Sequence, residues 1–279
     1  MRLYDTHFHF TGEATPVEYL AAVSDDLARA MKALGAEGQE PPELWYTCVG
    51  GDHMESLRAR EFASVVPRCR FAAGVHPHEA AEYLKTREDF SSFRDDPLLV
   101  AVGELGLDYY YELSDRQAQR QVFAEFLDLA LAWDRPAVVH LRDRDGADDA
   151  YREALELLTP FARSGGRFAV HCYAGTREYL ERFLDLGAFA GVTGMATFRA
   201  AENIRANLAL IPADRLLIET DSPYLAPVPF RGSENTPGLL ILAAAAAARV
   251  RGTTLEELAE LSWRNAAEFF RIGVENCDE

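Results

Sequence analysis

The segment QAQRQVFAEFLDLALAWDRPAVVH (Gln117–His140) contains one complete example of the unit from which the predicted fold is built. Its first part, Gln117–Trp133, carries apolar residues at three- and four-residue spacing, which predicts an amphipathic helix. Its last part, Ala137–His140, is a short apolar run, which predicts a buried strand. The segment therefore predicts a helix followed by a strand whose final side chain is ionisable.

The same alternation of strand and helix continues along the chain. Helical spacing of apolar residues recurs at Pro16–Leu34, Thr176–Leu186 and Thr253–Phe270. Strands that alternate with helices pair in parallel through right-handed crossovers. The predicted strands are the apolar runs Leu3–His9, Trp45–Val49, Arg70–Val75, Leu98–Gly103, Ala137–His140, Arg167–His171, Phe189–Val192 and Leu216–Glu219.

Eight such strands favour a closed (β/α)8 barrel over an open sheet, because no strand is followed by a glycine-rich nucleotide-binding motif. The length of 279 residues is also close to the roughly 250 residues of a typical barrel. The sequence has no serine- or proline-rich linker that would divide it. We therefore predict fold class α/β, with residues 1–279 forming a single-domain (β/α)8 TIM barrel.

The composition limits the expected partners and compartment. A formal net charge of −17 disfavours a protein that coats nucleic acid, but bound divalent cations reverse the local potential, so a nuclease is not excluded. Neither a membrane span nor a signal peptide is predicted, so no membrane partner is expected. The four cysteines are scattered and predict reduced thiols in a cytoplasmic protein; they are Cys48, Cys69, Cys172 and Cys277.

Metal-binding side chains stand at the carboxyl ends of several predicted strands. His7 and His9 lie two apart on the first strand, so both imidazoles point to one face. An isolated pair of this kind is as readily a polar cap on a strand. Burying an ionisable group is costly without a partner, however, and five strands share the pattern. The sequence therefore predicts a metal site built from His7, His9, Glu104, His140, His171 and Asp221.

The ligand types indicate two cations rather than one. Histidines and carboxylates without cysteine suit Mg²⁺, Mn²⁺ or Zn²⁺. Six ligands exceed the three that one open catalytic zinc takes, but fit a pair of ions about 3.5–4 Å apart. We expect Glu104, on a middle strand, to bridge them and Asp221 to orient the attacking water and accept its proton. Asp108 is expected to hold a ligand in place.

The motifs that carry this pattern resemble those of the TatD family of metal-dependent deoxyribonucleases, in the amidohydrolase superfamily. The resemblance implies a (β/α)8 barrel, the same six metal ligands and hydrolysis of DNA of the 3′–5′ exonuclease type. It adds His76 and His78 as groups near the substrate phosphate; the alternative is that their rings only cap the turn at Pro77. The motifs are Thr6–His9, Gly74–Glu79, Val102–Tyr110, Val138–Asp143, Val170–Gly175 and Leu216–Pro227, with Arg231–Pro237 as a weaker match.

The loop Pro223–Pro237 follows the last strand and is expected to form a wall of the site. It departs from the family pattern, because Ser233 stands where a lysine is usual and Thr236, rather than a glutamate, follows Asn235. This loss of positive charge weakens the case for binding a phosphate backbone. Arg142 and Arg231 are the candidates for bidentate phosphate contacts, with surface ion pairs as the alternative for each.

We therefore predict a metal-dependent hydrolase that cleaves phosphodiester bonds of DNA with a water activated by two metal ions. The rival is an amidohydrolase that acts on a small-molecule lactone, amide or ester, which the negative charge and the altered loop favour. A protein whose metals serve structure alone is a third class, disfavoured because structural sites use closed sets of four ligands. A monomer is expected, with a small oligomer as the alternative.

Overall fold

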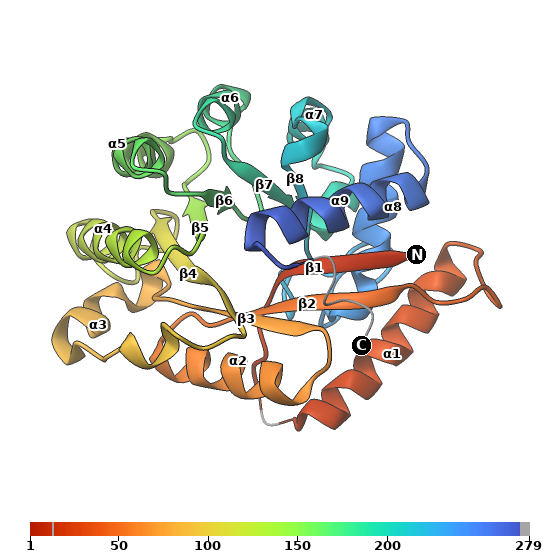
Figure 1. The fold of residues 1–279 in the computed structure, drawn as a ribbon. Coiled ribbons are helices and arrows are strands. Elements are labelled where there is room, and N and C mark those ends of the chain that lie inside the picture. The colour runs from red at the N-terminus through yellow and green to blue at the C-terminus, as the bar shows by residue number, and fades with distance from the viewer. Residues whose placement is uncertain (13, 274–279) are drawn as a thin grey trace.

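The computed structural model of the chain describes residues 1–12 and 14–273. These residues form one parallel sheet of eight strands in the order β1 to β8, with helices around its outside (Figure 1). A parallel bridge between Phe8 and Ser222 joins the two edges of the sheet and closes it. The predicted single-domain (β/α)8 barrel is thereby confirmed.

The helices and strands follow one another in strict alternation around most of the barrel. The strands are β1 (Arg2–Phe8), β2 (Glu43–Val49), β3 (Cys69–Ala73), β4 (Leu99–Asp108), β5 (Ala137–Arg142), β6 (Phe168–Val170), β7 (Phe189–Val192) and β8 (Leu216–Ile218). The helices are α1 (Pro16–Ala33), α2 (His53–Val65), α3 (Ala80–Thr86), α4 (Arg116–Ala132), α5 (Asp149–Arg163), α6 (Arg177–Asp185), α7 (Glu202–Leu210), α8 (Leu240–Arg251) and α9 (Leu255–Phe270). Short 3₁₀ turns are η1 (Pro77–Glu79), η2 (Ser91–Phe93), η3 (Gly194–Thr197), η4 (Ala213–Arg215) and η5 (Pro237–Leu239).

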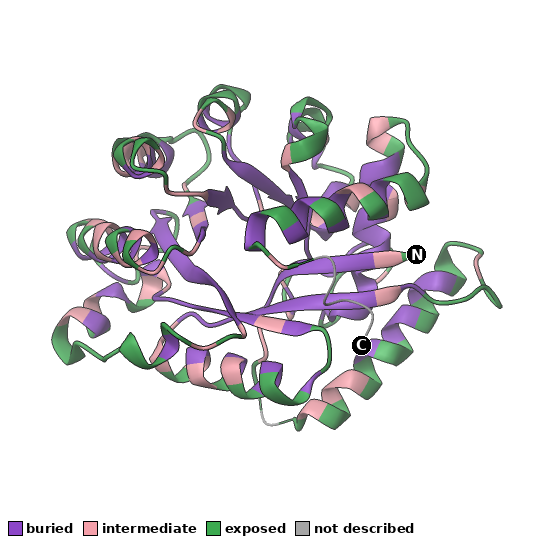
Figure 2. Ribbon diagram, in the orientation of Figure 1, coloured by how far each residue is buried: buried purple, intermediate pink, exposed green. Residues whose placement is uncertain are grey.

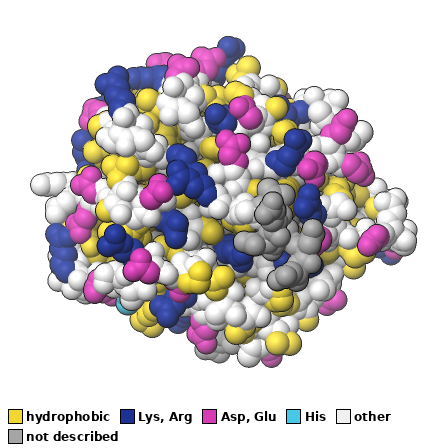
Figure 3. All heavy atoms as spheres, in the orientation of Figure 1, with side chains coloured by type: hydrophobic (Ala, Val, Ile, Leu, Met, Phe, Trp, Pro, Cys, Tyr) yellow, Lys and Arg dark blue, Asp and Glu magenta, His cyan; other side chains and the backbone are white. Residues whose placement is uncertain are grey.

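The largest part of the core lies between the strands and the surrounding helices. Most of the helices turn a buried face toward the sheet and an exposed face outward (Figure 2), whereas α8 is buried along nearly its whole length. On the face shown in Figure 3, acidic and basic side chains are interspersed rather than gathered into separate patches. The net charge of −17 is therefore not concentrated on that face.

A second, aromatic core seals the end of the barrel at which the strands begin. Helix α9 lies across this end (Figure 1), where Trp263 and Phe270 pack against Tyr4 and Trp45, the latter two from the starts of β1 and β2. Trp263 is 2% exposed. Among the described residues, buried aromatic side chains therefore fill this end of the barrel.

Strand β4 is longer than the predicted run Leu98–Gly103. It continues to Asp108, so Glu104 lies in the middle of the strand rather than at its end. The pairing register against β5 shifts between Val102 and Leu105, and Gly106 has φ +146°. A Cβ at Gly106 would meet the carbonyl oxygen of His140 at 2.0 Å, so only glycine allows β4 to run this close to β5.

The remaining expectations concern thiols and membranes. Cys48, Cys69 and Cys172 are free thiols, and Cys277 lies outside the described residues. Within residues 1–12 and 14–273, no single helix is both long and apolar enough to cross a membrane. The pair Pro237–Arg251 and Leu255–Phe270 meets that criterion only jointly, by length and composition, across a bend of 107°.

Candidate metal centre

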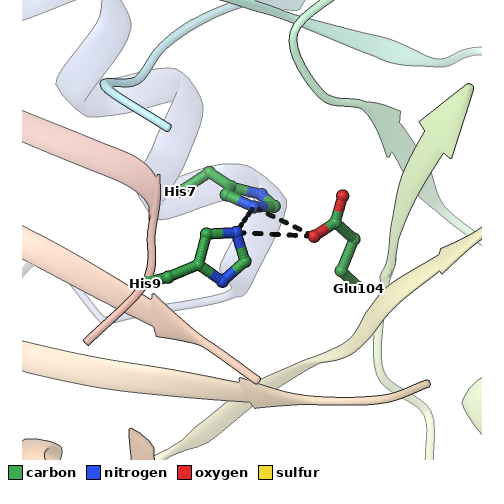
Figure 4. A group of neighbouring side chains, drawn as sticks. All are labelled: His7, His9 and Glu104. Atoms are coloured by element: carbon green, nitrogen blue, oxygen red, sulfur yellow. Dashed lines mark hydrogen bonds and ion pairs between the residues drawn. The ribbon is translucent and has the colours of Figure 1, made fainter. Parts of the chain in front are cut away.

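A first group of ligand atoms gathers inside the barrel, at the ends of β1 and β8 and opposite them on β4. The Nε2 atoms of His7 and His9 are 3.1 Å apart, and each lies 3.5 Å from Oε2 of Glu104 (Figure 4). Oδ1 of Asp221 lies 3.8 Å from His7 Nε2 and 3.7 Å from His9 Nε2. The two histidines approach from β1 and the glutamate from β4 across the barrel. Four side chains thus point lone-pair atoms at one small volume.

A second group lies on the other side of Glu104. Its Oε1 atom is 2.9 Å from Nδ1 of His140 and 2.7 Å from Nε2 of His171. These two ring nitrogens are themselves 3.1 Å apart. His76 Nε2 completes the group at 3.8 Å from the same oxygen. The sequence assigned His76 to substrate, but the structure places it among atoms that could hold an ion.

The spacing of these atoms fits bound cations. Two ligand atoms that each lie about 2.0–2.1 Å from one tetrahedral ion are separated by about 3.3 Å. The separations within both groups scatter around that value, from 2.7 to 3.8 Å. Glu104 presents Oε2 to one group and Oε1 to the other, so its carboxylate is the member that the two groups share.

The electrostatics of the cluster also favour positive charge between the carboxylates. Burial opposes ionisation of Glu104, but the neighbouring His171, His76 and His7 hold its pKa well below the usual range. Burial alone would lower the pKa of His9, yet the hydrogen bond to Asp221 and the charge of Glu104 raise it to about 9. Carboxylates that stay ionised at this depth suit a site that binds a cation.

Buried acceptors stand behind several of the candidate ligands and orient their rings. Nδ1 of His9 contacts the carbonyl oxygen of Val49 at 2.9 Å. Nε2 of His140 lies 3.2 Å from Oδ2 of Asp108, as the sequence predicted for that carboxylate. Such partners fix the ring orientation and raise the basicity of a ligating imidazole.

Glu219 lies close to His171, although just beyond hydrogen-bond distance, and the sequence interpretation missed it. Its Oε1 atom lies 3.6 Å from Nδ1 of His171 and accepts a hydrogen bond from the backbone N–H of Cys172. Its Oε2 atom accepts from the hydroxyl of Thr6 at 3.1 Å. The available signal was an ionisable residue at the end of the predicted strand Leu216–Glu219, two positions before Asp221.

Asp5 is a second residue that was missed, and it joins the first and last strands beneath the site. Its carboxylate accepts hydrogen bonds from the backbone N–H groups of His7 and Thr220 and from the Thr220 hydroxyl. Burial raises the pKa of Asp5 to about 8, although the bonds from Thr220 and His7 oppose that rise. The backbone N–H of Asp221 also donates to the His7 carbonyl at 2.9 Å. Asp5 and this backbone bond therefore fix His7 and Asp221 relative to each other.

The four residues expected to contact substrate lie at the same rim or on its loops. His78 Nε2 lies 3.1 Å from Asp108 Oδ2, so one carboxylate holds both His78 and His140. The exposed guanidinium of Arg142 lies 4.3 Å from the ring centre of Tyr110. Arg231, also exposed, lies 4.4 Å from the ring centre of Phe198. Among the described residues, neither arginine forms an ion pair, and each guanidinium lies over an aromatic ring.

The departure at Thr236, which follows Asn235, can be related to the structure. Asn235 is buried, and its side-chain amide donates to the carbonyl oxygens of Thr220 and Tyr224. Thr236 caps η5, and its hydroxyl contacts Asp26 Oδ2 at 2.9 Å. These residues hold the loop Pro223–Pro237 against the barrel rim rather than reaching out to a ligand.

Comparison with known proteins places this geometry in a family. A family model described as TatD related DNase matches residues 4–271 of the chain. The metal-dependent hydrolase YcfH of Escherichia coli is 35% identical over 272 residues, which cover 98% of this chain and 97% of that protein. The 3′-5′ ssDNA/RNA exonuclease TatD of Erwinia billingiae is 36% identical over 230 residues, which cover 80% of this chain and 86% of that protein. The crystal structure of YJJV, a TatD homologue from Escherichia coli, matches with a TM-score of 0.77 and 26% identity, covering 98% of this chain and 99% of that one.

Proposed function

The chain belongs to the TatD-related family of metal-dependent hydrolases, and from this premise we propose that it is a 3′–5′ exonuclease acting on single-stranded DNA. The observation that carries the proposal is the placement of Glu104, which offers one carboxylate oxygen to each of two adjacent groups of ligand atoms. A relative of 36% identity is named a 3′-5′ ssDNA/RNA exonuclease, which supports this substrate class.

Two divalent cations would be held by the two groups. By their distances from one another, His7, His9 and Asp221 would hold one, His140 and His171 the other, with Glu104 shared between them and His76 within reach of the second. Nitrogen and oxygen ligands of this kind suit Mg²⁺, Mn²⁺ or Zn²⁺. When bound, the cations lower the pKa of a water molecule and offset the charge of the phosphate.

Asp221 is the residue that we assign as general base. Burial raises the pKa of its carboxyl, but the His9 hydrogen bond and the charges of His171 and His7 hold the pKa below the usual range, so the carboxylate is ionised at neutral pH. In the proposed step the oxygen of water attacks phosphorus while Asp221 takes the proton of that water. The bond from phosphorus to the 3′ oxygen breaks, and the departing oxygen takes up a proton.

The substrate phosphates would be positioned by four side chains around the centre. His76 and His78 lie beside Glu104 and Asp108, close enough to orient a phosphate between the two groups of ligands. Arg142 and Arg231 are exposed on loops of the rim, and their planar guanidinium groups suit bidentate phosphate contacts. Together they would offset part of the charge of a polyanion.

The test is hydrolysis of 5′-labelled single-stranded DNA by the purified protein with Mg²⁺, Mn²⁺ or Zn²⁺, with and without a chelator. We expect a ladder that shortens from the 3′ end and disappears with chelator. Asp221→Asn should lose at least about 100-fold in rate while it retains metal, because an amide accepts no proton from water. An Asp221→Asn enzyme of full activity would exclude this residue as the base.

A small-molecule hydrolase is the competing function, and two features of the sequence favour it. The chain carries a net charge of −17, and Ser233 replaces a lysine in the loop next to Arg231. Both features oppose a long polyanionic substrate. Cleavage of a lactone, ester or amide panel, together with intact DNA in the assay above, would support this function instead.

A further inference from the structure

Exposed aromatic side chains flank the ligand cluster on opposite sides of the rim. Tyr111 follows β4 and is 53% exposed; Tyr224 follows β8 and is 60% exposed. Strands β4 and β8 are four places apart in the order of eight strands, so they face each other across the barrel. The two tyrosines therefore stand on either side of the volume where the ligand atoms converge.

Each ring lies next to a residue of the cluster. The Tyr111 ring is 5.6 Å from the His78 ring, and the Tyr224 ring is 6.4 Å from the His9 ring, measured between ring centres. Both contacts are edge-on, at 86° and 66°. A flat group that stacks on either tyrosine would thus be within a few ångströms of the histidines.

The segment that carries Tyr111 is held by a residue that also holds the cluster. Oδ1 of Asp108 accepts the backbone N–H groups of Tyr110 and Tyr111 at 3.0 and 2.9 Å, while its Oδ2 contacts His78 and His140. One buried carboxylate therefore fixes the distance between this ring and the candidate ligands.

The segment that carries Tyr224 is held in a similar manner. Its backbone N–H donates to the carbonyl of Asp221 at 3.0 Å, and its own carbonyl accepts from the buried amide of Asn235 at 2.7 Å. The backbone is thus ordered by a candidate ligand on one side and by a buried side chain on the other. Because this backbone is already ordered, Tyr224 loses little conformational entropy when its exposed ring stacks on a flat ligand.

Arg142 enlarges the flat surface that Tyr111 offers on the β4 side of the rim. Its guanidinium lies 4.3 Å from the ring centre of Tyr110 and 4.8 Å from that of Tyr111. Planar guanidinium and phenol groups are the side chains on which unpaired bases stack in proteins that bind single strands. The positive charge also attracts the adjoining phosphate.

We propose that Tyr111, backed by Arg142, and Tyr224 each stack on one of the two bases that flank the scissile phosphate. This inference rests on the proposed exonuclease function and names the residues that would make the enzyme select an unpaired 3′ end. The bases of a paired 3′ end are stacked inside the duplex and offer no free face, so neither Tyr111 nor Tyr224 can stack on them. The enzyme would therefore select its substrate by contacts with the bases, although the bond that breaks is at the phosphate.

The test uses a short 5′-labelled oligothymidylate with an abasic residue at either the last or the penultimate position. In the unaltered enzyme each abasic residue should raise KM roughly 10- to 100-fold, the range that loss of one base stack implies. In Tyr111→Ala one of these two penalties should vanish, and in Tyr224→Ala the other should vanish. Tyr→Phe at each position should behave as the unaltered enzyme, because it keeps the ring.

Leu113→Ala is the matched control, since Leu113 is 68% exposed on the same loop as Tyr111. It should retain both penalties. The proposal is overturned if both penalties persist undiminished in the two alanine variants, or if the phenylalanine variants lose as much as the alanine ones. Cleavage of methyl p-nitrophenyl phosphate, which carries no base, separates this failure from failure of the phosphodiesterase itself, in which neither substrate is cleaved.

Discussion

The two ends of the barrel are built from the same strands but from opposite kinds of side chain. Where the strands begin, Tyr4 and Trp45 pack with Trp263 of α9 in an aromatic cluster from which solvent is excluded. Near the opposite end, His7 and Glu104 are also buried, but they face other ionisable groups. The separation along β1 between Tyr4 and His7 is three residues.

This contrast shows how stability and chemistry are kept apart in one small domain. The apolar end gains free energy from burial alone. The polar end holds charged groups that are costly to bury unless each has a partner, so it depends on cations and on buried acceptors such as Asp108. We therefore expect substitutions at one end to change unfolding, and substitutions at the other to change metal content and rate.

The largest effect is expected for Glu104→Gln. The neutral amide cannot balance two cations, so metal content should fall and hydrolysis should drop by at least about 1,000-fold. Elemental analysis measures the metal content, and the labelled-DNA assay measures the rate of hydrolysis. Glu37→Gln, on the loop before β2, is the control and should keep both metal and rate. A variant that keeps two equivalents of metal would contradict the bridging role.

The next effect belongs to the opposite end. Trp263→Ala removes a side chain that is 2% exposed and stacked beneath Arg2. The free energy of unfolding should fall by about 3–5 kcal/mol, the usual cost of emptying such a site. Urea denaturation measures it, and Val17→Ala, at a position 78% exposed, is the control. The rate per folded molecule should be unchanged; a parallel loss of rate would show that the two ends are coupled.

A smaller effect is expected for Glu219→Gln, which weakens the support of His171 without removing a ligand. Metal affinity should decrease about 10- to 100-fold, as is usual when the acceptor behind a ligating histidine is replaced. Titration of the apoprotein with Zn²⁺ or Mn²⁺ measures this. Asp108→Asn should act similarly through His140. Unchanged affinity in both variants would mean that these carboxylates serve packing alone.

The smallest effect concerns the helix that seals the apolar end. Thr254 caps α9, accepting the N–H of Glu257, whose carboxylate accepts the N–H of Thr254 in return. Thr254→Ala should reduce the free energy of unfolding by about 1 kcal/mol. Thermal unfolding detects this, and activity at 25 °C should match the unaltered enzyme. Thr254→Ser, which keeps the cap, should show no such loss.

Features set by the alternation of residues along the chain could be predicted from sequence, and features set by contacts between strands could not. The order of eight strands and the gathering of His7, His140 and His171 at one rim follow from short apolar runs between helices. The extension of β4 past Glu104 depends on how closely Gly106 approaches the His140 carbonyl, which no local pattern encodes. The position of His76 beside Glu104 likewise arises from neighbouring strands.

The bond between the backbones of Asp221 and His7 has a consequence for synthesis of the chain. The two residues are separated by nearly the whole sequence, yet they are adjacent in the finished barrel. During translation, His7 and His9 are synthesised long before Asp221. The outer edge of β1 has no partner strand until β8 has been made. The ion-binding volume therefore takes its final shape only after the last strand has been synthesised and has paired with the first.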